Sequence, residues 1–240
     1  MLSYDALVIG FGKAGKTLAA KFATQGKSVA VIEKDPEMYG GTCINIGCIP
    51  TKVLIHAVET GHDFEQAMAE KEAVVSRLRA KNFNMLDQKE TLDVYNASAS
   101  FISNKVVKIT SENGDSQEVT AEIIIINTGA VPVQLPIKGL ATAKNVFDST
   151  GIQKLASQPK RLGIIGAGNI GLEFASLYGQ VGTDVQVFDP QSRILGREEE
   201  MVADAVRGYM EEKGVTFNMA AFISEVSNKG EQVVISTDKG

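Results

Sequence analysis

The sequence has few cysteines and histidines, no tryptophan, and no long apolar run. A length of 240 residues with only two cysteines argues against a disulfide-stapled miniprotein. The aliphatic block at residues 123–126 is far shorter than the roughly 18 apolar residues of a membrane-spanning helix. The first residues also lack the basic region and cleavage site of a secretory signal. We therefore expect a soluble, cytoplasmic protein with no membrane partner.

The charge balance is mildly acidic, with 24 basic and 29 acidic side chains and a net charge of −5. Without a basic run, this balance argues against nucleic acid as a partner. Apolar residues make up 44% of the chain, and its length suffices to bury a substantial core in one or two domains. Composition and charge leave the function open, so we look for it in the local sequence motifs.

The first such motif is a strand, a glycine turn and a helix near the N-terminus. Residues 4–9 form an apolar run, and residues 10–15 read Gly-Phe-Gly-Lys-Ala-Gly. Apolar residues at helical spacing follow until Gly26, and residues 28–32 predict a second strand that ends at Glu33, 23 residues after the first glycine. The apolar positions of the helix are Leu18, Ala19, Phe22 and Ala23. The pattern predicts a βαβ unit.

The same order of elements recurs in the second half of the chain. Residues 161–165 predict a strand, residues 166–171 read Gly-Ala-Gly-Asn-Ile-Gly, and a helix follows as far as Gly182. A strand at residues 184–188 leads to Asp189, again 23 residues after the first glycine. The expected helix face is Ile170, Phe174, Leu177 and Val181. The chain therefore contains two copies of one nucleotide-binding unit.

Each copy has the parts that a dinucleotide needs. Glycines allow close backbone approach, a helix N-terminus attracts the pyrophosphate, and an acid accepts from the ribose hydroxyls. A single G-x-G-x-x-G is a weak signal, but its repetition with strand, helix and acid favours binding. Asp189 favours NAD, because a carboxylate repels the 2′-phosphate of NADP; Arg193 could soften this preference or be a surface charge. The candidate residues are Gly10, Gly12, Gly15 and Glu33, then Gly166, Gly168, Gly171 and Asp189.

The segments between and after these copies suggest where the domains divide. Residues 91–110 and 119–126 predict β-structure around a polar turn at 112–115. Two prolines make residues 131–136 the best linker, so we expect domains at 1–130 and 149–240 joined by 131–148. We expect a strand at 233–237, with no partner following it in this sequence. Two further helix faces are Phe64, Met68, Val75 and Leu78, and Val202, Ala205, Val206, Tyr209 and Met210, the latter ending at Gly214.

Both cysteines lie in residues 40–52, Gly-Gly-Thr-Cys-Ile-Asn-Ile-Gly-Cys-Ile-Pro-Thr-Lys. Five residues of ideal helix rise about 7.5 Å, more than the usual Cα separation of about 4.4–6.8 Å in a disulfide. Gly47 and Pro50 allow the backbone to deviate, which suits an easily reduced catalytic bridge. Two reduced buried thiols, or a two-thiolate metal site without further ligands, are the alternatives; we expect no metal. His56 and His62 are expected on the following helix in structural or solvated roles.

The cysteine segment, the two glycine units and the strand end at Thr128 and Gly129 occur in an order that resembles the pyridine nucleotide–disulfide oxidoreductases. These FAD enzymes include dihydrolipoamide dehydrogenase, glutathione reductase and mercuric reductase. Residues 10–19, with Met38 and Tyr39, look most like a bacterial branch that defends against reactive chlorine species and hypothiocyanous acid. The resemblance implies an α/β fold with two Rossmann-like domains, FAD-binding then NAD-binding, truncated before a C-terminal dimerisation domain.

The resemblance also implies roles for single residues. Cys48 would be the thiol next to the flavin and Cys43 the outer thiol, with Lys52 and Glu173 paired beside the flavin. NADH would reduce FAD, and the reduced FAD would reduce the Cys43–Cys48 disulfide. The resulting dithiol would then reduce a small-molecule oxidant such as hypothiocyanous acid or a disulfide. Alternatives are a non-catalytic nucleotide-binding fragment, a mercuric-type metal-ion reductase and a dihydrolipoamide dehydrogenase. Further implied cofactor contacts are Lys34, Gly41, Thr42, Lys52, Thr128 and Gly129.

Enzymes of this kind continue beyond the point that matches Gly240. They return to the FAD domain and end in a dimerisation domain whose His–Glu pair serves the partner subunit as acid and base. The resemblance therefore implies a homodimeric parent enzyme and an N-terminal portion here. We expect residues 1–240 alone to turn over more slowly than the complete enzyme, because acid–base assistance contributes about 10²–10⁴-fold.

Overall fold

A computed structural model describes all 240 residues, which divide into two compact units. The first unit comprises residues Met1–Pro50 and Glu72–Val131, and the second comprises Thr51–Lys71 and Pro132–Gly240. No helix has both the length and the apolarity needed to cross a membrane. Each unit contains one of the two glycine motifs, so the nucleotide sites can be described separately.

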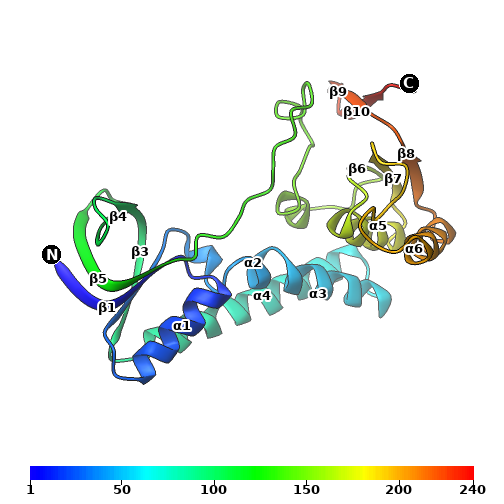
Figure 1. The fold of residues 1–240 in the computed structure, drawn as a ribbon. Helices are drawn as coiled ribbons and strands as arrows, with labels where there is room; N and C mark the ends of the chain where they lie inside the picture. The colour runs from blue at the N-terminus through cyan, green and yellow to red at the C-terminus, as the bar shows by residue number, and fades with distance from the viewer. The chain divides into compact units, whose positions relative to one another are not determined.

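The first unit is built on five strands that close into a barrel (Figure 1). The strands are β1 (Leu2–Ile9), β2 (Val29–Glu33), β3 (Leu92–Phe101), β4 (Val106–Ser111) and β5 (Ser116–Ile126). Neighbours in the order β3-β2-β1-β5 are parallel, whereas β4 runs antiparallel to both β3 and β5. Closure is possible because β3 is ten residues long: its first half pairs with β2 and its second half with β4.

Helix α1 (Lys13–Thr24) packs against β1 and β2 through small side chains. Gly15 and Ala19, one helical turn apart, are buried, which allows the helix axis to approach the sheet closely. The prediction that Leu18 belongs to the buried face is wrong: the residue is 42% exposed, because it lies one position off this narrow stripe. The helix ends before Gly26, which has a φ of 78°, as predicted.

Four helical segments follow β2 in the chain. They are η1 (Pro36–Met38), α2 (Thr42–Asn45), α3 (Cys48–Glu59) and α4 (Phe64–Asp87). The division between the units falls within α3 and again within α4. In the second unit, Leu54, Ala57, Phe64 and Ala67 from these helices share one core with residues of the second glycine unit. The predicted amphipathic helix that includes Phe64 and Val75 is confirmed, since both side chains are buried in α4.

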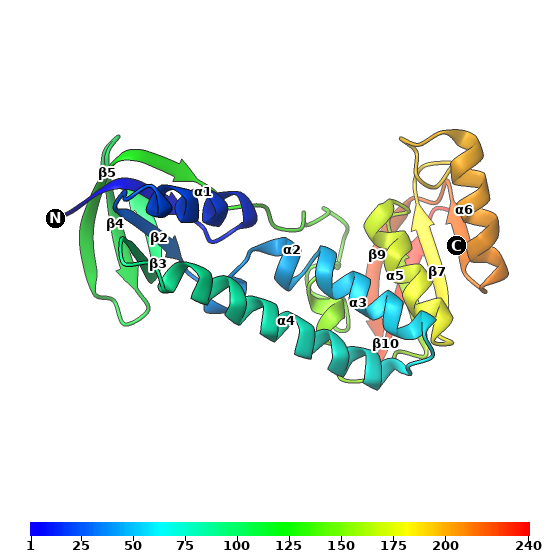
Figure 2. The same cartoon turned by 90° about the horizontal axis from the view of Figure 1, so that it is seen from below.

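The second unit has a parallel sheet in the order β6-β7-β8. Its elements are η2 (Gly151–Lys154), β6 (Arg161–Ile165), α5 (Asn169–Gln180), β7 (Asp184–Asp189), α6 (Glu200–Glu212) and β8 (Thr216–Met219). Helix α5 runs beside β7 (Figure 2) and buries Phe174, Leu177 and Tyr178. Ile170, predicted on this face, is 62% exposed, because it lies in the first turn, before the buried stripe begins at Leu172.

The buried face of α6 is also rotated from its predicted position. Ala203 and Met210 are buried, whereas Val202 and Tyr209 are 46% and 52% exposed. The true face follows residues seven apart in the sequence, one position from the predicted start. One position is about 100° of helix rotation, at 3.6 residues per turn, so three of the five predicted positions, Val202, Ala205 and Tyr209, are exposed, whereas the predicted Met210 is buried.

The last strand has a partner that the sequence did not reveal. Strands β9 (Ile223–Lys229) and β10 (Gln232–Thr237) form an antiparallel hairpin. Sequence reasoning looked for a partner strand only after residues 233–237. It did not predict the preceding strand, β9, which is the one that pairs with them. Gly230 has a φ of 61° in the connecting turn, which explains the tight reversal. The Val226 N–H also donates to the Lys138 carbonyl at 2.8 Å, which connects β9 to a residue inside the predicted linker.

Candidate functional site

The first glycine loop is tightly enclosed by its own unit. A Cβ at Gly10 would lie 2.2 Å from the carbonyl oxygen of Asn127, and one at Gly12 would lie 2.7 Å from the Asn127 side-chain nitrogen. A Cβ at Gly15 would meet both Asn127 and Val8 at 2.6 Å. Asn127 also donates to the Gly10 carbonyl at 3.1 Å. Sequence reasoning singled out only the following residues, Thr128 and Gly129, and missed this contact of Asn127 with the loop.

The second glycine loop leaves more space. A Cβ at Gly166 or Gly168 would have no atom within 4 Å, whereas one at Gly171 would lie 2.1 Å from the Gly166 carbonyl oxygen. Gly168 is the N-cap of α5, and Gly12 is the N-cap of α1; neither helix start has a side-chain cap. Uncapped N–H groups at a helix N-terminus favour an anion such as a phosphate.

The two acids make the same contacts in their respective units. Glu33 accepts hydrogen bonds from the Phe11 N–H at 2.9 Å and the Asp35 N–H at 3.1 Å. Asp189 accepts from the Ala167 N–H at 2.7 Å and the Gln191 N–H at 2.8 Å. Each carboxylate is thus held against the residue that follows the first glycine of its motif. This position suits an acceptor for ribose hydroxyls.

Arg193 is engaged within its own loop. Its guanidinium donates to the Glu198 carbonyl at 3.1 Å and to the Gly196 carbonyl at 3.5 Å. A cavity of about 400 Å³ lies beside it. The lining residues are Ser192, Arg193, Ile194, Glu200, Asp204 and Arg207. These hydrogen bonds to backbone carbonyls compete with any binding of the 2′-phosphate of NADP by Arg193.

The two cysteines lie on separate helices. Helix α2 ends at Asn45 and α3 begins at Cys48, and the Gly47 N–H turns back to the Thr42 carbonyl at 2.7 Å. This break is the deviation from one continuous helix that disulfide pairing requires. Both thiols are free, with Cys43 half-buried and Cys48 exposed, so neither is an inert, fully buried residue.

The thiols interact with each other. A hydrogen bond with the Cys48 side chain raises the pKa of the Cys43 thiol, and burial raises it further. Lys13 and the Cys48 N–H act in the opposite direction. Burial, with a smaller contribution from Lys13, lowers the pKa of Lys16, while the Cys43 charge opposes that change. Lys13 and Lys16 therefore share the electrostatic surroundings of Cys43, which sequence reasoning missed.

The cysteine segment packs directly on the first glycine loop. Gly40 and Gly41 have φ values of 97° and 75°, a conformation that side chains with a Cβ rarely adopt. A Cβ at Gly41 would lie 2.6 Å from the Gly12 Cα. Tyr39 anchors this approach, since its ring lies 4.9 Å from that of Phe11. The predicted thiol pair and the first predicted nucleotide loop are therefore neighbours.

The remaining predicted site residues of the first unit lie on exposed ends of elements. Lys34 follows β2, Thr42 opens α2, and Thr128 and Gly129 follow β5. Gly129 has a φ of 73°. Their part in cofactor binding stays a prediction.

Lys52 and Glu173 form an ion pair in the second unit. The contact joins α3 to α5, and the two side chains are 62% and 36% exposed. The structure therefore brings together the two residues that the resemblance paired. An exposed ion pair of this kind contributes about 0–1 kcal/mol to the free energy of folding. The pair therefore adds little to the stability of the protein.

The two histidines occupy different settings. His56 lies on α3, but the expectation that His62 shares that helix is wrong, because α3 ends at Glu59 and Gly61 has a φ of 96°. The His62 N–H donates to the Ala57 carbonyl at 2.9 Å. The His62 ring lies 3.8 Å from the Glu70 carboxylate.

Comparison with known proteins agrees with this arrangement. A family model described as pyridine nucleotide-disulphide oxidoreductase matches residues 4–240. The chain is 42% identical to the probable pyridine nucleotide-disulfide oxidoreductase RclA of Escherichia coli (strain K12) over 99% of this chain and 54% of that protein. It is 32% identical to a dihydrolipoyl dehydrogenase of Chlamydia trachomatis, over 96% of this chain and 52% of that protein. The chain thus spans about half the length of these relatives.

Solved structures give the same result. The structure of the HOCl-induced flavoprotein disulfide reductase RclA from Escherichia coli matches with a TM-score of 0.94 and 42% identity, over 99% of this chain and 54% of that one. A Cu(II) complex of that protein matches with a TM-score of 0.97 and 42% identity, over 100% of this chain and 54% of that one. The predicted resemblance and the predicted α/β fold are confirmed.

Proposed function

Because the chain belongs to the pyridine nucleotide-disulphide oxidoreductase family, we propose that it carries the nucleotide sites and the redox-active thiols of an RclA-type flavoprotein disulfide reductase. The observation that carries this proposal is the packing of the cysteine segment on the first glycine loop, where a Cβ at Gly41 would lie 2.6 Å from the Gly12 Cα; in that segment Cys48 also raises the pKa of the Cys43 thiol. Two free thiols in contact can exchange with an external oxidant while a nucleotide site adjoins them.

We propose that FAD binds the first unit at the start of α1. The uncapped N-terminus of α1 offers N–H groups to a pyrophosphate, and Glu33 is already oriented toward the loop. When bound, FAD supplies transfer of two electrons between a nicotinamide and a disulfide. The proposed set in the first unit is Gly10, Gly12, Gly15, Glu33, Lys34, Gly41, Thr42, Thr128 and Gly129; the family resemblance adds Lys52, which belongs to the second unit.

NADH fits the second unit by the same criteria. The loop formed by Gly166, Gly168 and Gly171 is open above its second glycine, and the α5 N-terminus is uncapped. Asp189 adds a negative charge where a 2′-phosphate would approach, which favours NADH over NADPH. Lys52 and Glu173 are proposed to lie beside the reactive edge of the flavin, as the family resemblance implies.

The cysteines are proposed to transfer electrons to the final oxidant. With a disulfide R–S–S–R′, Cys43 attacks one sulfur and releases R′–SH; Cys48 then attacks the mixed disulfide and releases R–SH. The oxidant gains two electrons and two protons, and the Cys43–Cys48 bond forms. With hypothiocyanous acid, the same two-electron oxidation of the dithiol yields the disulfide, thiocyanate, water and one released proton. The assignment of Cys43 as the exchanging thiol follows the resemblance.

The proposal extends to the setting of the complete enzyme. We propose a cytoplasmic homodimer that acts on a small oxidant or disulfide, with its subunit interface outside the described residues. The description of the similar RclA structure as HOCl-induced supports a role in oxidative stress.

Thiol counting tests this function. The oxidised chain, saturated with FAD, is reduced anaerobically by NADH, and accessible thiols are titrated in denaturant. We expect two additional thiols per chain, and no such gain in Cys43→Ser or Cys48→Ser variants that unfold at the parent temperature. Binding of both nucleotides with no gain in thiols would instead identify a non-catalytic nucleotide-binding module.

Cu(II) reduction is a second candidate, favoured by the solved Cu(II) complex of the similar protein. The two thiols would give one electron to each of two Cu(II) ions, forming one disulfide, two Cu(I) ions and two protons. Anaerobic addition of Cu(II) in the presence of a Cu(I)-specific chelator should yield two Cu(I) per chain. An equal yield from Cys43→Ser would exclude this role for the pair.

A further inference from the structure

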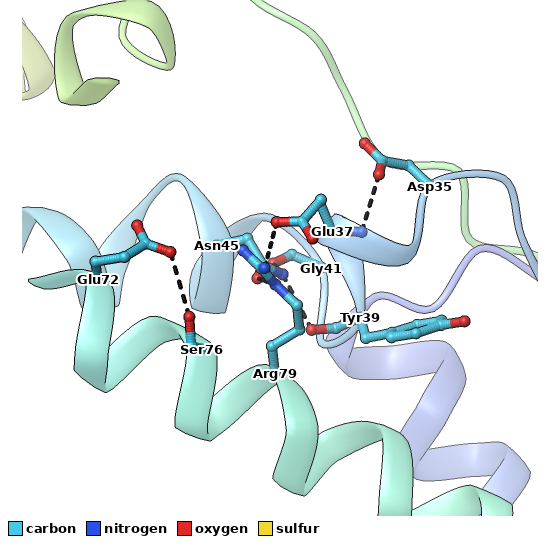
Figure 3. A network of polar contacts seen from close by, with 8 residues as sticks. All are labelled: Asp35, Glu37, Tyr39, Gly41, Asn45, Glu72, Ser76 and Arg79. Atoms are coloured by element: carbon cyan, nitrogen blue, oxygen red, sulfur yellow. Dashed lines mark hydrogen bonds and ion pairs between the residues drawn. The ribbon is translucent and has the colours of Figure 1, made fainter. Parts of the chain in front are cut away.

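The four-residue helix that carries Cys43 is held by a side chain at its own end. Asn45 donates from its amide nitrogen to the Tyr39 carbonyl and to the Gly41 carbonyl, each at 3.0 Å (Figure 3). Isolated helices much shorter than about 12 residues are not stable by themselves in water. The conformation of α2 (Thr42–Asn45) therefore depends on such contacts with its surroundings.

A residue from a distant helix sets the direction in which this amide points. Arg79, on α4, donates from Nε to the Asn45 side-chain oxygen at 3.0 Å and forms an ion pair with Glu37 (Figure 3). A guanidinium only donates hydrogen bonds, so it selects the oxygen of the Asn45 amide. The amide nitrogen must then face the two backbone carbonyls. The Arg79 side chain is only 17% exposed, which limits its freedom to leave.

The same turn determines where the first thiol lies. Gly41 is the N-cap of α2, and its carbonyl accepts from the Ile44 N–H, the Asn45 N–H and the Asn45 side chain. Cys43 lies inside this closed turn. The next carbonyl, that of Thr42, accepts from the Ile46 N–H at 3.0 Å and the Gly47 N–H at 2.7 Å. The backbone between the two cysteines is thus continuous with the turn that Asn45 closes.

We propose that Arg79 is a positioning residue for the redox pair, which acts through Asn45 to hold the Cys43 turn where its thiol meets Cys48. The inference rests on the proposed function, in which the pair alternates between dithiol and disulfide. Arg79 itself contacts neither sulfur in the described interactions. Its effect is to raise the effective concentration of one thiol at the other, as preorganisation does in other intramolecular reactions.

The equilibrium between dithiol and disulfide measures this effect directly. The two protein thiols lose two electrons and two protons to oxidised glutathione, which is cleaved to two reduced glutathiones as the Cys43–Cys48 bond forms. The chain contains only these two cysteines, so the disulfide fraction read by mass spectrometry after acid quenching is unambiguous. Arg79→Ala should lower the equilibrium constant about tenfold, which corresponds to about 30 mV for two electrons.

Matched variants separate positioning from a general loss of structure. Arg77, on an exposed position of the same helix, provides Arg77→Ala as the control, which should stay within about twofold of the parent. Arg79→Lys keeps a positive charge but lacks the planar fork, so its constant should fall between the parent and Arg79→Ala. If Arg79→Ala does not fold, Arg79→Lys is compared with the control instead.

The outcomes distinguish this inference from the proposed function. A parent chain that forms the disulfide with the same constant as the Arg79 variants would overturn the inference and leave the proposed function intact. An equal fall in Arg77→Ala would also overturn it. A parent that never forms the disulfide at any glutathione ratio would overturn the proposed function, and the inference with it. A selective fall in the Arg79 variants at unchanged unfolding temperature would support the inference.

Discussion

Replacing Gly168 by alanine should separate nucleotide binding from folding. Gly168 has a φ of −85° and a ψ of 179°, a conformation open to any residue, and an added Cβ would meet no atom within 4 Å. The new methyl group would therefore cost little in the free protein. It would occupy the space above the loop where a pyrophosphate must approach the backbone.

The expected effect on stability is a near cancellation. Alanine is a poorer N-cap than glycine by about 0.5–1 kcal/mol, whereas removing a glycine from the unfolded chain gains about 0.4–1 kcal/mol. The free energy of unfolding should therefore change by less than about 0.5 kcal/mol, or roughly 2 °C in unfolding temperature. The loss of one charge-assisted hydrogen bond to the pyrophosphate costs about 1.5–3 kcal/mol, so NADH should bind about 10–100-fold more weakly.

Gly171→Ala is the matched control in the same loop. Its Cβ would lie 2.1 Å from the Gly166 carbonyl oxygen, and a backbone atom cannot yield as a flexible side chain does. Overpacking of this kind costs about 3 kcal/mol, against a gain of about 1 kcal/mol in helix propensity. The net loss of about 2 kcal/mol should lower the unfolding temperature by roughly 4–8 °C.

Thermal unfolding and calorimetric titration with NADH test both variants on the same preparations. The reasoning would be refuted if Gly168→Ala unfolded as early as Gly171→Ala, because the space above Gly168 would then be occupied by the protein itself. If Gly168→Ala bound NADH within threefold of the parent affinity, the predicted approach of the pyrophosphate to the backbone at Gly168 would be refuted.

Three further predictions concern charge and thiol chemistry. NADH should bind at least about tenfold more tightly than NADPH because of Asp189, and competitive titration that reverses this order would contradict the assignment. Cys48 raises the pKa of the Cys43 thiol, so less Cys43 thiolate is present near neutral pH. Cys48→Ala should therefore speed alkylation of Cys43 several-fold near about pH 8. Equal alkylation rates in the variant and the parent would show that Cys48 does not control the reactivity of Cys43. Glu173→Gln should change the free energy of unfolding by less than about 1 kcal/mol in urea titration, because its ion pair with Lys52 is exposed; a larger loss of stability would contradict the assignment of this pair as an exposed one.

Local patterns predicted much of this fold because the relevant contacts are close in sequence. The acids Glu33 and Asp189 were found by their 23-residue spacing, and both bind the N–H groups of their glycine loops. Strand, turn and helix are consecutive there, so the spacing fixes the geometry. Gly47 was likewise recognised as a residue that allows the backbone to deviate between the cysteines, and α2 and α3 are separate helices there.

Contacts between distant residues could not be read in this way. Nothing near Arg79 indicates that it binds Asn45, 34 positions earlier, because that contact depends on how α4 lies against the α2 turn. The closure of the first sheet depends on the second half of β3 pairing with β4, a choice that strand propensity leaves open. The rotated face of α6 reflects the narrowness of its buried stripe, which contains only Ala203 and Met210 as buried residues.

The two glycine motifs share a sequence pattern but differ in their surroundings, and this difference bears on what they bind. Asn127 and Gly41 pack against the first loop, whereas no atom lies near the added Cβ of Gly166 or Gly168 in the second. The first loop is therefore packed against its own unit at all three of its glycines, whereas the second leaves its first two glycines open to a ligand. This difference agrees with the proposed assignment of a retained cofactor, FAD, to the first loop and of an exchanging one, NADH, to the second.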